Sequence, residues 1–162
     1  MNTQRGVVMV VCLVFLLLLS LLAVSSMQNA TLQEKVAGSL RLRDATFQQA
    51  EALLRQGELQ TFGSALPACS TPAQCLPPAE ALTLTTGGMN GRSGIDWVAT
   101  QGGFYGIQHL GETDDPTGVE PGPPDKTWTL HRITAVATQG TSRTVLESVY
   151  SEGQRILWRQ RQ

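Results

Sequence analysis

The chain has 162 residues, of which 12 are basic and 13 acidic, so its net charge is close to zero. A general nucleic-acid surface needs accumulated positive charge, and this balance argues against one. Once the apolar N-terminal run is set aside, the remainder is long enough for one modest domain.

The N-terminus joins a short polar leader, Met1–Gly6, to an apolar run, Val7–Val24, that is broken only by Ser20. A membrane-spanning helix needs about 20 apolar residues, and the run nearly meets that length. Arg5 on the short side predicts a cytoplasmic N-terminus, with the rest of the chain beyond the inner membrane. A secretory signal cleaved near Ala23-Val24-Ser25 is the alternative.

Arg5 and Gly6, followed directly by the apolar run, resemble the leader of a type IV prepilin. The resemblance implies that a dedicated prepilin peptidase cuts after Gly6 and methylates the new N-terminus at Val7. Glycine at this position suits a scissile bond that must extend into a protease site.

The next segment is polar but strongly helix-forming, from Thr31 to Gln56. One apolar stripe recurs along it at steps of three, four or seven residues: Leu32, Val36, Leu40, Phe47, Ala50 and Leu54. Gly57 is expected to end the helix. We therefore expect one helix over Val7–Gln56, the alternative being a membrane helix followed by a separate one.

Residues 4–56, with Thr31-Leu32-Gln33-Glu34 and Ala50-Glu51-Ala52 among them, are similar to the start of the PilX-type minor pilins. The resemblance implies an α+β, type IV pilin-like fold, in which a long N-terminal helix packs on a small antiparallel sheet. It divides the chain into a leader (1–6), a membrane and filament-core half-helix (7–30), an amphipathic half-helix (31–56) and a β-rich periplasmic or pilus-surface domain (57–162).

The three cysteines have different surroundings. Cys12 lies inside the apolar run and is expected to act as a small apolar side chain. Cys69 and Cys75 flank a short proline-containing stretch, which in a periplasmic domain predicts a disulfide. A zinc site would need further ligands, and His109 and His131 are isolated in the sequence.

Strand-like segments dominate the rest of the chain. Alternating or apolar patterns predict three to five antiparallel strands on the amphipathic half-helix, drawn from Ala81–Thr85, Ile95–Thr100, Phe104–Leu110, Trp128–Thr138 and Arg143–Tyr150. The last two, joined at Gln139–Ser142, fit a hairpin with one buried face, and they resemble the family's usual ending. The final Arg155, Arg159 and Arg161, with Trp158, are either a solvated end or a contact with another subunit.

An acidic, proline-rich loop is expected at Gly111–Asp125. Asp114, Asp115 and Asp125, with Glu112 and Glu120 nearby, are weak calcium candidates without EF-hand spacing, and the alternative is a solvated loop. We expect no other cofactor and no catalysis. Gly87–Gly94 is better interpreted as turns than as a phosphate cradle, and Ser93 lacks the glycine spacing of a nucleophile elbow.

If cleavage follows Gly6, the fifth mature residue is Val11. Type IV pilins usually carry glutamate there, to neutralise the amino terminus of a neighbouring subunit in the apolar filament core. An unpaired buried amino terminus is costly, so a subunit without this glutamate suits a position with no predecessor. The departure resembles the GspK pseudopilin of type II secretion.

The resemblance thus implies a minor pilin at or near the pilus tip that primes assembly and affects pilus biogenesis, twitching motility and adhesion. Its expected partners are other minor pilins, the major pilin, a tip adhesin, the prepilin peptidase and the inner membrane, with no nucleic acid. The alternative function is a membrane-anchored periplasmic binding module.

Overall fold

A computed structural model describes residues 3–61, 66–89, 91–118, 123 and 125–161. Met1 and Asn2 of the leader, Asn90 of the predicted turn and Glu120 of the acidic loop lie outside the described residues. The chain divides into two units, residues 1–41 and residues 42–162, and each is described by itself.

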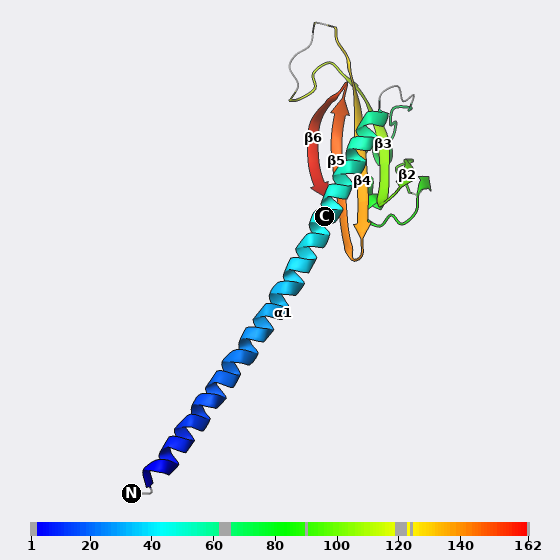
Figure 1. Cartoon of the computed structure of the whole chain (residues 1–162). Helices are drawn as coiled ribbons and strands as arrows, with labels where there is room; N and C mark the ends of the chain where they lie inside the picture. Colours follow the sequence, from blue (N-terminus) through cyan, green and yellow to red (C-terminus); the bar gives the residue numbers. More distant parts are fainter. Residues whose placement is uncertain (1–2, 62–65, 90, 119–122, 124, 162) are drawn as a thin grey trace. The chain divides into compact units, whose positions relative to one another are not determined.

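The first element, α1, is a single helix from Thr3 to Gln60 that continues through Gly38 (Figure 1). The alternative of two separate helices is therefore wrong. In the first unit every side chain described is exposed. Three hydroxyls there, those of Ser20, Thr31 and Ser39, donate to carbonyls three residues earlier at 2.8–2.9 Å. The helix thus satisfies these polar groups internally, which suits a low-polarity environment.

Gly57 does not end α1, contrary to the prediction, because the helix continues to Gln60. The residue is buried against the sheet. A Cβ atom at this position would lie 2.5 Å from Ile133 Cγ2 and 3.1 Å from Tyr105 Cδ2. Glycine is therefore required for the close approach of the helix to the sheet, and not for a helix stop.

The second unit contains a six-stranded antiparallel sheet whose strands follow one another in chain order (Figure 1). The strands are β1 (Gly88–Met89), β2 (Asp96–Thr100), β3 (Gly103–Thr113), β4 (Trp128–Gln139), β5 (Ser142–Ser151) and β6 (Gln154–Arg161). The α+β arrangement predicted from the sequence is confirmed, as is the long hairpin of β4 and β5.

Two predictions about the strands are wrong. Ala81–Thr85 is not a strand: η1, a short 3-10 helix from Ala79 to Leu82, begins before this segment and covers its start. Pro77 and Pro78 immediately precede η1, and proline cannot donate to a strand ladder. The predicted number of three to five strands is also too low, because the basic C-terminal segment pairs with β5 as β6.

The core has two parts, one on each face of the sheet. Between α1 and the sheet lie Ala50, Leu53, Leu54, Tyr105, Ile133, Ala135, Ala137, Leu146 and Tyr150. On the opposite face lie Ala81, Leu84, Ile95, Trp97, Val136 and Val145. The predicted hairpin with one buried face is therefore wrong, since Ile133 packs toward the helix and Val145 packs away from it. Of the predicted helix stripe, Leu32, Val36 and Leu40 are exposed.

Arginines hold the irregular segment before β1 against the sheet. Arg132 of β4 donates to the carbonyl of Cys75 at 2.6 Å. Arg143 of β5 donates to the carbonyl of Leu84 at 2.6 Å, and Arg161 of β6 to that of Pro78 at 2.7 Å. A proline-rich segment has few partners for its own carbonyls, so the guanidinium groups satisfy oxygens that would otherwise be buried unpaired.

Candidate functional site

The apolar N-terminal part of α1 is the feature with the clearest functional chemistry. Its one candidate membrane span among the described residues begins at Gly6 and reaches a mean hydropathy of 3.3 over 18 residues. Val7–Val24 would be about 27 Å long at about 1.5 Å per residue, close to the thickness of a bilayer core. Its side chains are exposed, so they are available to lipid or to other apolar helices.

The residues predicted for processing lie at the start of this helix. A Cβ atom added at Gly6 would have no neighbouring atom within 4 Å, so no packing contact explains the glycine. Val7 and Val11 are 65% and 47% exposed. Because Gly6 lies within α1, cleavage after it would require the helix to open locally. The roles of Gly6, Val7 and Val11 stay predictions.

The structure joins Cys69 to Cys75 by a disulfide, the pairing that the sequence predicts, with the Cα atoms 5.3 Å apart. The bridge encloses α2, a single helical turn from Pro72 to Cys75 whose N-cap is Thr71. On one side of it, the amide of Cys69 donates to the carbonyl of His109 in β3 at 2.8 Å. The disulfide thus fixes a loop that is bonded to both β3 and β4. Cys12 is free and exposed on α1.

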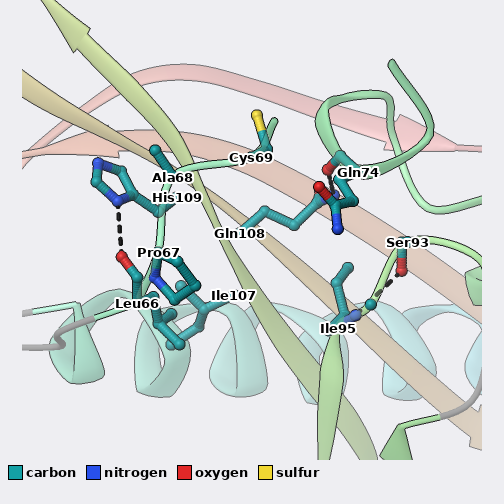
Figure 2. Close-up of a pocket in the computed structure, with 11 residues that line it drawn as sticks. Leu66, Pro67, Ala68, Cys69, Gln74, Ser93, Ile95, Ile107, Gln108 and His109 are labelled. Atoms are coloured by element: carbon teal, nitrogen blue, oxygen red, sulfur yellow. Dashed lines mark hydrogen bonds between the residues drawn. The ribbon is translucent and has the colours of Figure 1, made fainter. Parts of the chain in front are cut away.

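A small hollow lies between this loop and β3 (Figure 2). Its volume is about 120 Å³, and it is lined by residues of three segments: Leu66–Cys69, Ser93–Ile95 and Ile107–His109, with Gln74. The Gln108 amide crosses it to donate to the carbonyls of Gln74 and Leu76. Sites for organic ligands usually occupy about 300–1,000 Å³, so this hollow is suited to a few water molecules.

The sequence suggested that His109 and His131 are isolated from one another, but in the structure they are close together. They are opposite one another in β3 and β4, and their rings stack with centroids 5.1 Å apart. Nδ1 of His109 lies 2.8 Å from the carbonyl of Leu66 (Figure 2). Burial, and secondarily the neighbouring His109, lower the pKa of His131. Among the described residues no third histidine, cysteine or carboxylate joins them in a group that could hold a metal.

Two buried glutamates anchor β6. Glu58 of α1 forms an ion pair with Arg155 at 2.7 Å and accepts a hydrogen bond from the Ser148 hydroxyl at 2.7 Å. Glu147 of β5 is only 3% exposed. It pairs with Arg159 at 2.6 Å and with Arg161 at 3.0 Å. The basic residues of the C-terminal segment therefore hold their own strand in the sheet. Their partners lie elsewhere in the chain, which local sequence reasoning could not supply.

The calcium candidates that the structure describes are not gathered in one group. Asp114, Asp115 and Asp125 are exposed, and the ion pair next to Asp125 in the chain joins Lys126 to Glu152 at 2.8 Å. In the described part of the loop, as elsewhere in the described chain, no three carboxylate, histidine or cysteine side chains form a group suited to a metal ion. Calcium binding stays a prediction, and Glu120 lies outside the described residues.

Comparison with known proteins identifies the N-terminal segment. A family model described as PilX N-terminal matches residues 5–55. Residues 5–55 are therefore a PilX-type N-terminal segment. The match covers most of α1 and ends before the sheet begins. The curated proteins contain no match to the chain, and neither do the solved structures.

The PilX-type segment relates the chain to the minor pilins of type IV pili, which are structural proteins that interact with other pilus components. An apolar helix of this length suits anchoring in the inner membrane. The resemblance to the GspK pseudopilin stays a prediction.

Proposed function

We propose that this chain is a minor pilin that primes the assembly of type IV pili with other minor pilins, at or near the pilus tip. The observation that carries the proposal is the combination of a PilX-type N-terminal helix with valine at position 11. An apolar helix of this kind can move from the bilayer into a filament core and pack there among similar helices. Because residue 11 is valine, this helix has no carboxylate to neutralise the amino terminus of the preceding subunit.

The lack of a carboxylate at position 11 affects the contact with the subunit ahead in the filament. In an apolar filament core an amino terminus without a counter-charge is expensive to bury. This chain, with Val11, offers no carboxylate to the subunit ahead of it. A tip position has no subunit ahead, so the cost does not arise there. Along the shaft the same cost would recur at every inserted copy. The segment therefore supports an initiating subunit with a β-rich surface domain that is first periplasmic and then displayed at the cell surface.

Location in sheared filaments tests the tip placement. We expect gold-labelled antibody against the β-rich domain to mark filament ends, with few labels along the shafts. Regular labelling along shafts would contradict the tip position. Replacement Val11→Glu is expected not to improve pilus number, because a tip subunit has no amino terminus to neutralise. A higher pilus number in Val11→Glu would contradict this reasoning.

Priming is a separate part of the proposal. A deletion strain is expected to make few pili while its major pilin accumulates in the inner membrane. Overproducing the major pilin should not restore pilus number, since nucleation rather than supply is limiting. Normal pilus number in the deletion strain would contradict a priming role. The competing function, an anchored binding module, predicts a protein that stays in the membrane fraction and is absent from sheared filaments.

A further inference from the structure

The outer edge of the sheet at β6 is open. β6 is the last strand in the sheet order, and no strand of the described chain lies beyond it (Figure 1). Alternate N–H and C=O groups of an edge strand point away from its neighbour and can pair with another strand. Most residues of β6 are exposed. The sheet therefore ends in an eight-residue edge strand, six residues of which are exposed.

Charged side chains often protect such edges from pairing, but those of β6 are occupied elsewhere. Arg159 and Arg161 turn onto one face of the sheet, toward Glu147. Arg155 turns to Glu58 of α1. Each guanidinium is held by a carboxylate of its own chain. The arginines thus leave the strand's hydrogen-bonding edge uncovered.

Three hollows adjoin along β6 and β5. The first, of about 420 Å³, is mainly apolar and is lined among others by Pro116, Leu130, Val149, Ile156 and Leu157. The second, of about 140 Å³, shares Val149 and Leu157 with the first. The third, of about 430 Å³, shares Pro77 and Arg159 with the second. The shared lining residues make one groove that follows the edge strand.

This groove lies on the face of the sheet opposite α1. In the β4–β5 register Val149 is opposite Arg132, next to Ile133, whose side chain packs toward the helix. Side chains of adjacent strand residues point to opposite faces. Val149, and Leu157 opposite it on β6, therefore point away from α1. The groove and the residues of α1 that pack on the sheet therefore lie on opposite faces of the sheet.

The two ends of the groove differ in chemistry. At the apolar end Leu157 is 52% exposed, and Asp115 is the acidic residue of the lining. At the other end three arginines, Arg132, Arg159 and Arg161, face the single carboxylate of Glu147. That end therefore has an excess of positive charge, which favours an acidic occupant. It opposes a second copy of β6, which would bring the same arginines.

We propose that β6 accepts an extended segment of a partner protein as an added strand. On the side chains that face the groove, every second residue, the segment is apolar at one end, where it fills the hollow over Val149 and Leu157, and acidic at the other, beside Arg159 and Arg161. Backbone pairing supplies affinity in this mode, and the pockets for alternate side chains supply specificity. The inference does not rest on the placement of the chain at the pilus tip.

The test uses the full chain in detergent micelles and three labelled ten-residue peptides. In the valine–glutamate peptide, every second residue is threonine, and the positions between are valine in one half and glutamate in the other, so that both types face the groove. The valine–lysine peptide has lysine in place of glutamate, and the third is the valine–glutamate peptide with a central proline. Fluorescence anisotropy should show saturable binding of the first peptide, and at least tenfold weaker binding of the other two. Hydrogen exchange should slow at the β6 amides when the first peptide is bound. Micelles without protein are the control for nonspecific adsorption.

Two groove variants and one matched variant complete the test. Leu157→Glu in the apolar end and Leu76→Glu beside the arginines, at exposed positions, should each weaken binding of the valine–glutamate peptide at least tenfold. Val98→Glu, an exposed position on β2 far along the strand order from β6, should leave it unchanged. Thermal unfolding of each variant confirms that it is folded.

Four results would overturn the proposal. One is the absence of saturable binding by the valine–glutamate peptide. Another is equal binding of the valine–lysine peptide, and the third is protection of β1 or β2 amides instead of those of β6. Unchanged binding by both groove variants would also exclude the groove as the site.

Discussion

Gly57 makes the packing of α1 on the sheet directly testable through Gly57→Ala. In an exposed helix interior this change stabilises by about 1 kcal/mol, and by less in a last turn such as this one. Here the new methyl would lie 2.5 Å from Ile133 Cγ2, a contact too short for the core to accept without movement. Overpacking of this kind costs about 1–3 kcal/mol. We expect a net loss of about 1–2 kcal/mol, and a fall in the unfolding midpoint of roughly 4–10 °C.

The assay is thermal and urea unfolding of the full chain in micelles, followed by tryptophan fluorescence. Gly38→Ala is the matched control, because Gly38 lies in the same helix with nothing within 4 Å of the added atom. It should cause no loss of stability. A double variant with Ile133→Ala should lose less than the sum of the two single changes, since the clashing methyl is gone. A stabilising effect of Gly57→Ala would refute the proposed close contact.

Further predictions concern charge, the disulfide and pH. Glu147→Gln should lower the free energy of unfolding by about 2–3 kcal/mol in urea, because it leaves arginines of β6 without their buried counter-ion. Glu51→Gln, in an exposed ion pair of the helix, should lower it by less than about 0.5 kcal/mol. Replacing both Cys69 and Cys75 by serine should cost about 2 kcal/mol by the entropy of a short closed loop, measured against the oxidised chain. The lowered pKa of His131 means that the folded chain binds its proton less readily than the unfolded chain. The stability from the neutral ring is thus complete above its ordinary pKa of 6.5 and is lost as pH falls below that value, and His131→Gln should flatten this part of the stability–pH curve. An unchanged slope in that variant would assign the acid sensitivity to other groups.

The long helix and the β4–β5 hairpin follow from local sequence, and both were predictable. The apolar run and the stripe that ends at Leu54 give α1 its pattern. Gly140, with a positive φ of 58°, lies in the turn where the sequence changes from one alternating run to the next. Such signals need no knowledge of distant residues.

β6 could not be predicted because its partners are remote. Its arginines resemble a solvated tail when the local sequence is considered alone. What makes the segment a strand is Glu147, twelve residues before Arg159, and Glu58, ninety-seven residues before Arg155. The same limit applies to the histidine pair: only the register of β3 with β4 places His109 opposite His131.

The opposite error occurred at Ala81–Thr85, where alternation suggested a strand. Pro78 restricts the chain just before it, and Arg143 takes the carbonyls of Ala81 and Leu84 that a strand would offer to a neighbour. The apolar residues of this segment are buried for another reason, because Ala81 and Leu84 pack on the face of the sheet opposite α1. A periodic pattern shows that a segment is half-buried without showing what it is bonded to.

Pilin processing can be tested directly by the intact mass and the N-terminal peptide of the protein extracted from membranes. Processing as a pilin predicts a chain that has lost Met1–Gly6 and begins at a methylated Val7. A chain that still begins at Met1, or one cut near Ser26, would contradict pilin processing and leave an anchored or secreted binding domain.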